Sequence, residues 1–432
     1  GIPHRDIDAM PAPVSPTESE TMKYHSRHPQ EAAPRPSGMA RLLVLLFMLA
    51  VVMPAGARLR HADSTLLLGC ERDSLYLPLL SGRRVALFSN QTGVDSHGLH
   101  TLDRLLASGV KVTTLFGPEH GFRGTADAGE HVSSSVDEPT GIPIRSLYDG
   151  GSTGPGDAIM HDFDVLVVDI QDVGLRFYTY YISMLRLMNR CGQTDRQVVV
   201  LDRPNPTGHY ADGPILEDSL HSGVGALPIP VVHGLTLGEL ALMAQGEGWV
   251  EHPCSLTVIP CRGYTHSTLY TLPVAPSPNL PDMRSIYLYA SICPFEGTTL
   301  SLGRGTAHPF QMYGHPELRG CSFSFTPRSM PGAKNPPLLN QECRGVDLSA
   351  LPMDKLERWD RIHLEYVIDA FQRMEDKDNF FGSRAHFFDL LMGTPRVRQM
   401  IVEGASEKDI RRTWKSGLKR FLRQRKPYLL YP

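Results

Sequence analysis

The sequence predicts an α/β fold in which a doubly wound, parallel sheet is followed by a smaller α+β domain. Short apolar runs rich in β-branched residues, such as "DVLVVDI" (164–170), alternate with segments whose apolar residues recur at helical spacing. These runs are apolar on both faces, as strands buried inside a parallel sheet are. Because strands that alternate with helices build βαβ units, the first domain is expected to be Rossmann-like.

Each element of the sheet domain is predicted from its own stretch of sequence. The expected elements, in chain order, are a strand over 84–90, a helix over 97–109, strands over 110–116 and 164–170, a helix over 178–192 and a strand over 197–202. Gly109 and Gly192 close the two helices, as C-terminal glycines commonly do. We place the Rossmann-like catalytic domain at residues 63–235.

The remaining residues, 236–432, are predicted to form an auxiliary α+β domain. It is expected to begin with a helix over 236–249 and a short strand over 255–261. A further strand region, a long helix over 356–374 and a C-terminal helix are expected after them.

Composition narrows the class of protein. The chain has 432 residues, a formal net charge of −3 and 41% hydrophobic residues, which is ordinary for a globular protein. The charge gives no reason to expect a nucleic-acid partner. The one basic cluster, "RQRK" (423–426), is interpreted as a solvated helix end.

The N-terminal region predicts export. Residues 39–57, "MARLLVLLFMLAVVMPAGA", combine Arg41, an apolar run over 42–53 and a small-residue site at 55–57, which are the three parts of a signal peptide. Residues 1–38 are interpreted as a disordered leader or a mis-called start, with Met39 as the true start. The protein is therefore expected to be periplasmic or secreted, with no stable membrane span once the signal is removed. A retained membrane anchor is the alternative.

Several familiar motifs are missing from the sequence. The seven cysteines form no C-x-x-C pair, and no H-E-x-x-H occurs, so no metal is expected. Neither G-x-G-x-x-G after a strand nor a P-loop is present, so no cofactor is expected. The G-x-S-x-G elbow of serine esterases is absent as well.

Polar residues follow all four predicted strands, where a doubly wound sheet binds its ligand. A second polar, glycine-rich stretch, "FEGTTLSLGRGTAHPF" (295–310), and the loop "PSPNLPD" (276–282) could supply the other wall of a cleft. The candidate site residues are Asn90, Glu119, His120, Arg123, Gln171, Asp172, Arg176, Tyr178, Asp202, Asn205, Asn279, Glu296 and Arg304.

Three of these candidates, Glu119, Asp172 and Glu296, are carboxylates next to apolar or aromatic residues, where partial burial could raise a pKa. A protonated carboxylic acid beside an ionised carboxylate is the arrangement that hydrolyses glycosides. The structural alternative is that a carboxylate pairs with a nearby arginine, for example Asp172 with Arg176 or Glu296 with Arg304.

Eight ordered motifs from about residue 66 onward resemble the NamZ-type exo-β-N-acetylmuramidase family. They are "FSNQTGVD", "LFGPEHGFRGTADAGEHV", "GIPIRSLY", "DVLVVDIQDVGLRFYTY", "VVLDRPNPTG", "PIPVVHGLTLGELA", "PSPNLP" and "FEGTTLSLGRGTAHPF". The resemblance implies an exported glycosidase that removes non-reducing-terminal, β-1,4-linked N-acetylmuramic acid from peptidoglycan fragments.

The resemblance also suggests roles. Glu119 would be the general acid, with Asp172 or Glu296 as the second carboxylate; participation of the substrate's own acetamido oxygen is an alternative. Arg176 or Arg304 would bind the lactyl carboxylate bidentately, and an asparagine, 90 or 205, would bind the N-acetyl group. Two other interpretations remain: a non-catalytic periplasmic muropeptide- or sugar-binding protein, and an amidase or esterase.

Overall fold

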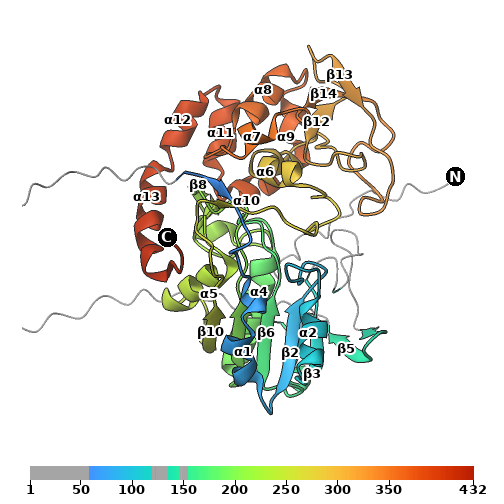
Figure 1. Cartoon of the computed structure of the whole chain (residues 1–432). Coiled ribbons are helices and arrows are strands. Elements are labelled where there is room, and N and C mark those ends of the chain that lie inside the picture. Colours follow the sequence, from blue (N-terminus) through green and yellow to red (C-terminus); the bar gives the residue numbers. More distant parts are fainter. Residues whose placement is uncertain (1–57, 119–121, 123–134, 146, 148–153) are drawn as a thin grey trace, which may run out of the picture. The chain divides into compact units, whose positions relative to one another are not determined.

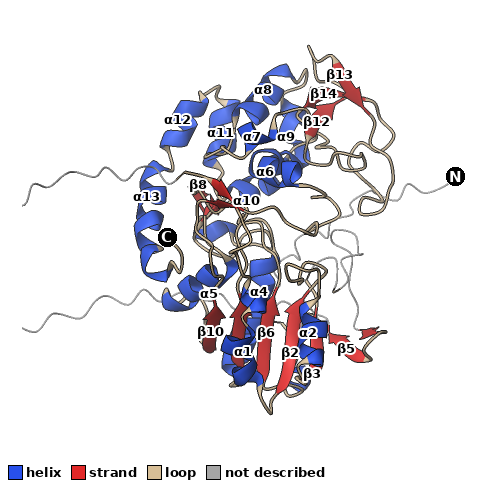
Figure 2. Ribbon diagram, viewed as in Figure 1, coloured by secondary structure: helices blue, strands red, loops and turns tan. Residues whose placement is uncertain are grey.

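A seven-stranded sheet forms the centre of the first part of the chain (Figures 1 and 2). The computed structural model describes residues 58–118, 122, 135–145, 147 and 154–432. The strand order is β10-β7-β6-β2-β3-β5-β4, and all neighbours are parallel except β4 and β5. The strands are β2 (Arg84–Ser89), β3 (Lys111–Phe116), β4 (Ser135–Asp137), β5 (Ile142–Arg145), β6 (Val165–Asp169), β7 (Gln197–Leu201) and β10 (Ser255–Ile259).

The apolar strands are buried on both faces, as their sequences predict. Along β2, Val85 and Leu87 belong to one core cluster, while Ala86 and Phe88 belong to the other. This alternation follows from the two-residue repeat of a strand. The first cluster includes residues of α1 (Asp73–Leu80) and α2 (Thr101–Ala107), and the second includes residues of α4 (Tyr180–Gln193) and α5 (Leu237–Gly246). The predicted doubly wound arrangement is confirmed.

The predicted elements of the sheet domain are found, with shifted ends. The helix expected over 97–109 begins at Thr101, because His100 accepts a hydrogen bond from the Leu102 N–H and caps it. The sequence analysis did not predict α1, β4 or β5. It also missed α3 (Asp157–Met160), the parallel pair β1 (Arg60–His61) and β11 (Thr268–Leu269), and the antiparallel pair β8 (Asp212–Ile215) and β9 (Pro230–Val232).

The C-terminal part combines a small antiparallel sheet, of order β12-β14-β13, with a group of helices (Figure 2). Its strands are β12 (Met312–His315), β13 (Phe323–Phe325) and β14 (Cys343–Asp347). Its helices are α6 (Met283–Ile292), α7 (Met353–Leu356), α8 (Glu365–Arg373), α9 (Asp378–Phe381), α10 (Ala385–Met392), α11 (Arg396–Val402), α12 (Glu407–Arg412) and α13 (Lys415–Gln424). This smaller second part agrees with the predicted fold class.

The single long helix predicted over 356–374 is wrong. The structure instead has α7 and α8, separated by an irregular segment. Within this segment the Ile362 N–H donates to Asp212 Oδ2 at 2.7 Å, and the His363 N–H donates to Ser291 Oγ at 3.0 Å. These tertiary hydrogen bonds use donors that a continuous helix would need for its own backbone, so the apolar periodicity does not give one helix.

Strand β10 lies beyond the boundary predicted at 235/236, yet it is hydrogen-bonded to β7 at the edge of the main sheet. Helix α5, which leads into β10, packs on α4 and β10. The sheet thus groups residues 236–259 with the first part. No helix of the described residues is both long and apolar enough to cross a membrane.

Candidate active site at the carboxyl ends of the parallel strands

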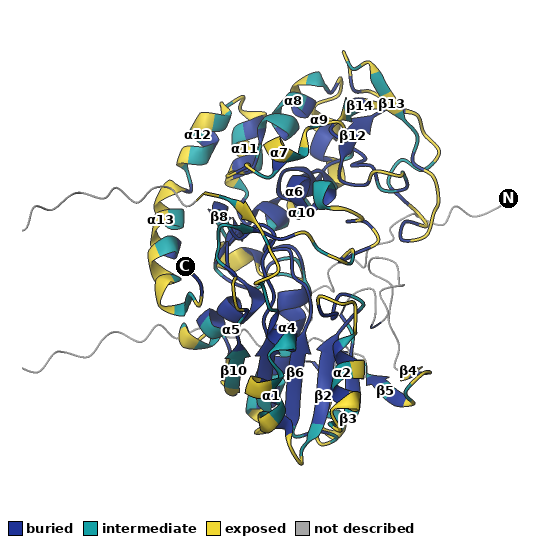
Figure 3. Cartoon of the chain, in the orientation of Figure 1, coloured by how far each residue is buried: buried dark blue, intermediate teal, exposed yellow. Residues whose placement is uncertain are grey.

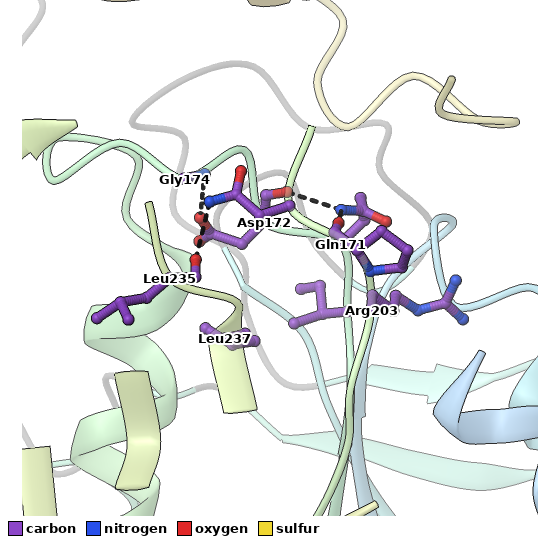
Figure 4. Close-up of a pocket in the computed structure, with 9 residues that line it drawn as sticks. Gln171, Asp172, Gly174, Arg203, Leu235 and Leu237 are labelled. Atoms are coloured by element: carbon purple, nitrogen blue, oxygen red, sulfur yellow. Dashed lines mark hydrogen bonds between the residues drawn. The ribbon is translucent and has the colours of Figure 1, made fainter. Parts of the chain in front are cut away.

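A small pocket lies where β6 and β7 end, the position expected for a ligand site in a doubly wound sheet. The space between its lining atoms, open solvent included, is about 180 Å³, whereas pockets that hold drug-sized ligands measure about 300–1,000 Å³. The pocket is therefore too small to hold a sugar residue by itself. It is lined by Ile170, Gln171, Asp172, Gly174, Arg203, Pro204, Asn205, Leu235 and Leu237 (Figure 4).

Asp172 lines this pocket, and one of its two carboxylate oxygens has no hydrogen-bond partner. Its Oδ1 accepts a hydrogen bond from the Gly174 N–H at 2.7 Å, while its buried Oδ2 has no partner. Burial raises the pKa of the carboxyl from 3.8 to about 7, against the lowering effect of the backbone hydrogen bonds. No ion pair joins Asp172 to Arg176 among the described residues, so the predicted alternative of that pair is wrong.

Gln171 and Asn205 fix the backbone around Asp172. Gln171 Nε2 donates to the Asp172 and Pro204 carbonyls, both at 2.8 Å, and its buried Oε1 has no partner. Asn205 Oδ1 accepts from the Thr207 N–H at 2.8 Å, and its Nδ2 donates to the Leu235 carbonyl at 2.8 Å. The Asn205 amide is thus already engaged at both ends, whereas Gln171 keeps a free acceptor.

Gly174 has a reason to be glycine. Its φ is +79°, and a Cβ there would lie 2.3 Å from Asn205 Oδ1. Both the left-handed backbone and the close approach of the amide exclude a side chain. The turn that carries Asp172 depends on this residue.

Asp202, at the end of β7, organises the floor beneath the pocket. Its Oδ1 accepts from the Gly238 N–H at the start of α5, and its Oδ2 accepts from Thr236 Oγ1 at 2.7 Å and from the Tyr431 hydroxyl at 2.6 Å. Burial raises the pKa of Asp202 to about 6, although these donors lower it. The carboxylate therefore ties β7, α5 and the C-terminal segment together.

Arg203 is held by a buried ion pair. Its Nε and Nη2 donate to the two carboxylate oxygens of Asp169 at 2.5 and 2.9 Å. Burial alone would lower the pKa of Arg203, but the charge of Asp169 raises it. This bidentate pair fixes the arginine at the pocket wall.

Arg176 is fully buried and binds backbone carbonyls. Its Nη1 donates to the carbonyls of Pro214 and Ile229 at 2.8 and 2.7 Å, and its Nη2 donates to that of Leu391 in α10 at 3.0 Å. Burial lowers its pKa to about 10. The guanidinium thus joins the first part of the chain to α10, and in this conformation it is closed to a ligand carboxylate.

Asn90 follows β2, and Tyr178 lies between β6 and α4. Both are linked by hydrogen bonds to Tyr180 or to Pro276. Asn90 accepts from the Thr92 N–H at 2.9 Å and donates to the Tyr180 hydroxyl at 3.0 Å. The hydroxyls of Tyr178 and Tyr180 both donate to the Pro276 carbonyl, at 3.1 and 2.6 Å. Through Tyr180, the residue after β2 is therefore linked by hydrogen bonds to the 276–282 loop.

Asn279, in the same 276–282 loop, binds a second, longer loop formed by residues 326–342. Its Nδ2 donates to the Gly332 carbonyl at 2.9 Å, and the same loop returns to the Arg304 segment, where the Arg328 N–H donates to the Gly305 carbonyl at 2.8 Å. The 276–282 and 326–342 loops therefore form a wall next to Arg304.

Glu296 and Arg304 form the ion pair given as an alternative in the sequence analysis. Nε and Nη2 of the arginine contact Glu296 Oε1 at 2.7 and 2.5 Å, and the guanidinium lies 5.0 Å from the centroid of the Phe310 ring. The Glu296 side chain is 14% exposed and that of Arg304 is 19% exposed. Both side chains are therefore partly exposed, whereas the unbonded oxygen of Asp172 is buried.

Aromatic rings connect the two carboxylates. Tyr289 of α6 packs 6.2 Å from Tyr178, centroid to centroid. Burial is the main cause that raises the pKa of each hydroxyl, with smaller contributions from Asp172 at Tyr178 and from Glu296 at Tyr289. Asp172 is thus near Tyr178 and Glu296 is near Tyr289, and we call this pair of rings the aromatic belt. Tyr289 was missed in the sequence analysis, although the D-x-x-S cap before "IYLYA" could have revealed α6.

Glu119, His120 and Arg123 lie outside the described residues. Strand β3 ends at Phe116, and the described chain reaches Pro118, one residue before Glu119. Since β3 is the immediate neighbour of β2 in the parallel sheet, its carboxyl end belongs to the same edge as those of β2, β6 and β7.

The comparisons with known proteins decide the family. The family model described as "Exo-beta-N-acetylmuramidase NamZ, N-terminal" matches residues 85–284, and the corresponding C-terminal model matches residues 287–431. The chain belongs to the NamZ exo-β-N-acetylmuramidase family. The two NamZ models meet just after the start of α6, beyond the last strand of the main sheet.

Individual NamZ relatives agree with this result. The chain is 37% identical over 373 residues to the peptidoglycan β-N-acetylmuramidase NamZ of Bacillus subtilis (strain 168). The aligned region covers 82% of this chain and 89% of that protein. Two crystal structures of DUF1343 family proteins from Bacteroides fragilis NCTC 9343 are similar. One has 53% identity and a TM-score of 0.78, covering 86% of this chain and 99% of that one; the other has 29% identity and a TM-score of 0.69, covering 86% and 100%.

Membership of the NamZ family confirms the predicted resemblance and the predicted enzyme class, a glycosidase. The similar crystal structures confirm the fold class. The binding-protein and the amidase or esterase interpretations are left without support.

Proposed function

We propose that this glycosidase removes β-1,4-linked N-acetylmuramic acid from the non-reducing end of peptidoglycan fragments. The observation that carries the proposal is the match of both halves of the chain to the NamZ family, together with 37% identity to a peptidoglycan β-N-acetylmuramidase. The geometry is compatible with it, because a charged carboxylate–arginine pair and an aromatic belt border the ligand edge of the sheet.

Catalysis is assigned to two carboxylates. Glu119, in the "GPEHG" motif, is proposed as the general acid that gives its proton to the glycosidic oxygen as the C1–O bond breaks. Glu296 is proposed as the second carboxylate, since its side chain is partly exposed and forms an ion pair with Arg304. Asp172 is the weaker candidate, because its one unbonded oxygen is buried.

The second carboxylate has one of two tasks. It either attacks C1 to form a glycosyl-enzyme that water then hydrolyses, or it takes a proton from the water that attacks C1 directly. In both cases the leaving sugar receives the proton from Glu119 and the released sugar receives the hydroxyl of water. Attack by the substrate's acetamido oxygen remains a third route.

Recognition of the lactyl carboxylate is assigned to Arg304. Arg176, the other candidate, is fully buried, and its Nη1 and Nη2 already donate to three carbonyls inside the protein, although its Nε has no partner. Arg304 uses Nε and Nη2 for Glu296, whereas its Nη1 has no hydrogen-bond partner among the described residues. One guanidinium would thus hold the catalytic carboxylate and the substrate carboxylate together.

The test is hydrolysis of a chromogenic β-N-acetylmuraminide by Glu119→Gln and Glu296→Gln. Each substitution should lower kcat by about 10²- to 10⁴-fold, the usual contribution of a general acid or base. Glu317→Gln, at an exposed glutamate of the same C-terminal part, is the matched control and should keep the parent rate. Full activity of Glu119→Gln would remove the general-acid assignment, and full activity of Glu296→Gln would transfer the second role to Asp172.

We also propose that the protein is exported to the periplasm or the medium and that residues 39–57 are removed on the way. The support is the charged, apolar and small-residue order of this segment. N-terminal sequencing of the protein recovered outside the cytoplasm should begin near residue 58. A start before Met53 would contradict removal of the segment.

A further inference from the structure

The last 23 residues of the chain, 410–432, contain eight lysines and arginines and no aspartate or glutamate. This concentration is local, because the whole chain carries a formal charge of −3. The proposed chemistry at the sheet edge uses none of these cations.

Three of the eight cations have structural partners. Arg411 pairs with Asp212 at 2.9 Å, and Arg412 pairs with Asp409 at 2.6 Å. Arg425 donates to the carbonyls of His233 and Gly234 at 2.8 and 3.1 Å. These three cations therefore already have partners within the chain.

The other five cations lie on the outer side of α13 and just beyond its end, and we call them the basic stripe. All five are exposed, and none has an ion-pair or hydrogen-bond partner among the described residues. Figure 3 shows the exposed outer side of α13 at the edge of the C-terminal part. The basic stripe consists of Lys415, Lys419, Arg420, Arg423 and Lys426.

The arrangement costs stability. Lys415, Lys419 and Arg423 follow one another at four-residue spacing, so they form a row on one helix face; each like-charged neighbour pair costs about 0.2–0.5 kcal/mol. Lys415 is also the first residue of α13, where the positive end of the helix dipole disfavours a cation. Neither ion pairs within the helix nor the helix dipole explains why these three cations lie in a row on α13.

We propose that the basic stripe binds the polymeric, carboxylate-bearing glycan of peptidoglycan, as a second contact outside the cleavage site. The inference rests on the proposed function, since that substrate carries a lactyl carboxylate on each unsubstituted muramic acid. A row of cations spanning about 12 Å from Lys415 to Arg423, at 1.5 Å per residue, can contact an extended polyanion at several points.

A glycan fits better than a membrane surface. Helices that bind membranes insert an apolar face below the headgroups, but the apolar side of α13 already packs on the protein. Phe421 is buried, and Leu418 packs against the main core. The stripe therefore offers charge without an apolar face for insertion.

The test compares the full chain with the triple variant Lys415→Gln, Lys419→Gln, Arg423→Gln. The matched control is Lys111→Gln, Arg344→Gln, Lys355→Gln, which removes three exposed cations elsewhere. Binding to glycan strands freed of peptide is measured by co-sedimentation at low and high salt. Binding to phosphatidylglycerol vesicles and hydrolysis of the small chromogenic muraminide are measured in parallel.

The proposal predicts that the triple variant binds the glycan strands about tenfold more weakly at low salt, because exposed charge contacts contribute about 0.2–1 kcal/mol each. The difference should fade at high salt, the control should bind like the parent, and hydrolysis of the small muraminide should be unchanged. Equal glycan binding by parent and triple variant would overturn the proposal, as would a loss confined to the vesicles. A parent that binds the strands through the stripe but does not hydrolyse the muraminide would contradict the proposed function alone.

Discussion

Replacing Asp172 with asparagine should change how stability depends on pH. Asparagine keeps an oxygen for the Gly174 N–H but cannot ionise. In the parent, burial raises the Asp172 pKa from 3.8 to about 7, so between these pH values the folded protein holds a proton that the unfolded chain has lost. Stability then falls as pH rises through this window. At 1.36 kcal/mol for each pH unit, the full difference is about 4 kcal/mol.

The assay is urea unfolding of the parent and of Asp172→Asn at pH 5 and pH 8. The free energy of unfolding of the variant, relative to the parent, should rise by about 3 kcal/mol between the two values, since most of the titration window lies between them. Asp202, whose pKa is about 6, titrates in both proteins and cancels in the difference. A change below about 0.5 kcal/mol would refute the assignment of a raised pKa to Asp172 and the burial argument behind it.

Three further substitutions test the account. Arg176→Met should lower the free energy of unfolding by about 3–5 kcal/mol, measured in urea, because three carbonyls lose a charged donor; an unchanged midpoint would contradict its bridging role. Arg304→Lys should lower kcat/KM for the muraminide by about tenfold to 100-fold, since an ammonium cannot replace the planar fork, and parent-like kinetics would count against it. Tyr431→Phe should cost about 1–3 kcal/mol in thermal unfolding, because Asp202 loses a donor; no loss would show that the C-terminal tie is dispensable.

The main sheet could be predicted because its signals are local. β6 is apolar on both faces, and Gly109, which closes the helix predicted over 97–109, lies two residues beyond the end of α2 at Ala107. The break between α7 and α8 could not be predicted, because it depends on Asp212, which is 150 residues away in the sequence. Nor does the sequence of β10 reveal that it pairs with β7 and extends the first part of the chain.

The candidate site shows the same division. Polar residues after each strand predicted the edge at which Asp172 lies, and the Glu296–Arg304 pair was foreseen as an alternative because eight residues separate the partners. The engagement of Arg176 with Leu391 was not foreseeable, because it joins residues 215 apart. Sequence thus indicates which side chains gather at an edge, while tertiary contacts decide which of them remain open to a ligand.

The most direct test of the central claim is hydrolysis of a chromogenic β-N-acetylmuraminide beside the matching β-N-acetylglucosaminide, which lacks the lactyl carboxylate. The account predicts release from the muraminide alone, and loss of that release in Glu119→Gln. Equal release from both sugars would contradict recognition of the carboxylate by Arg304. Release from neither would contradict the proposed exo-muramidase activity.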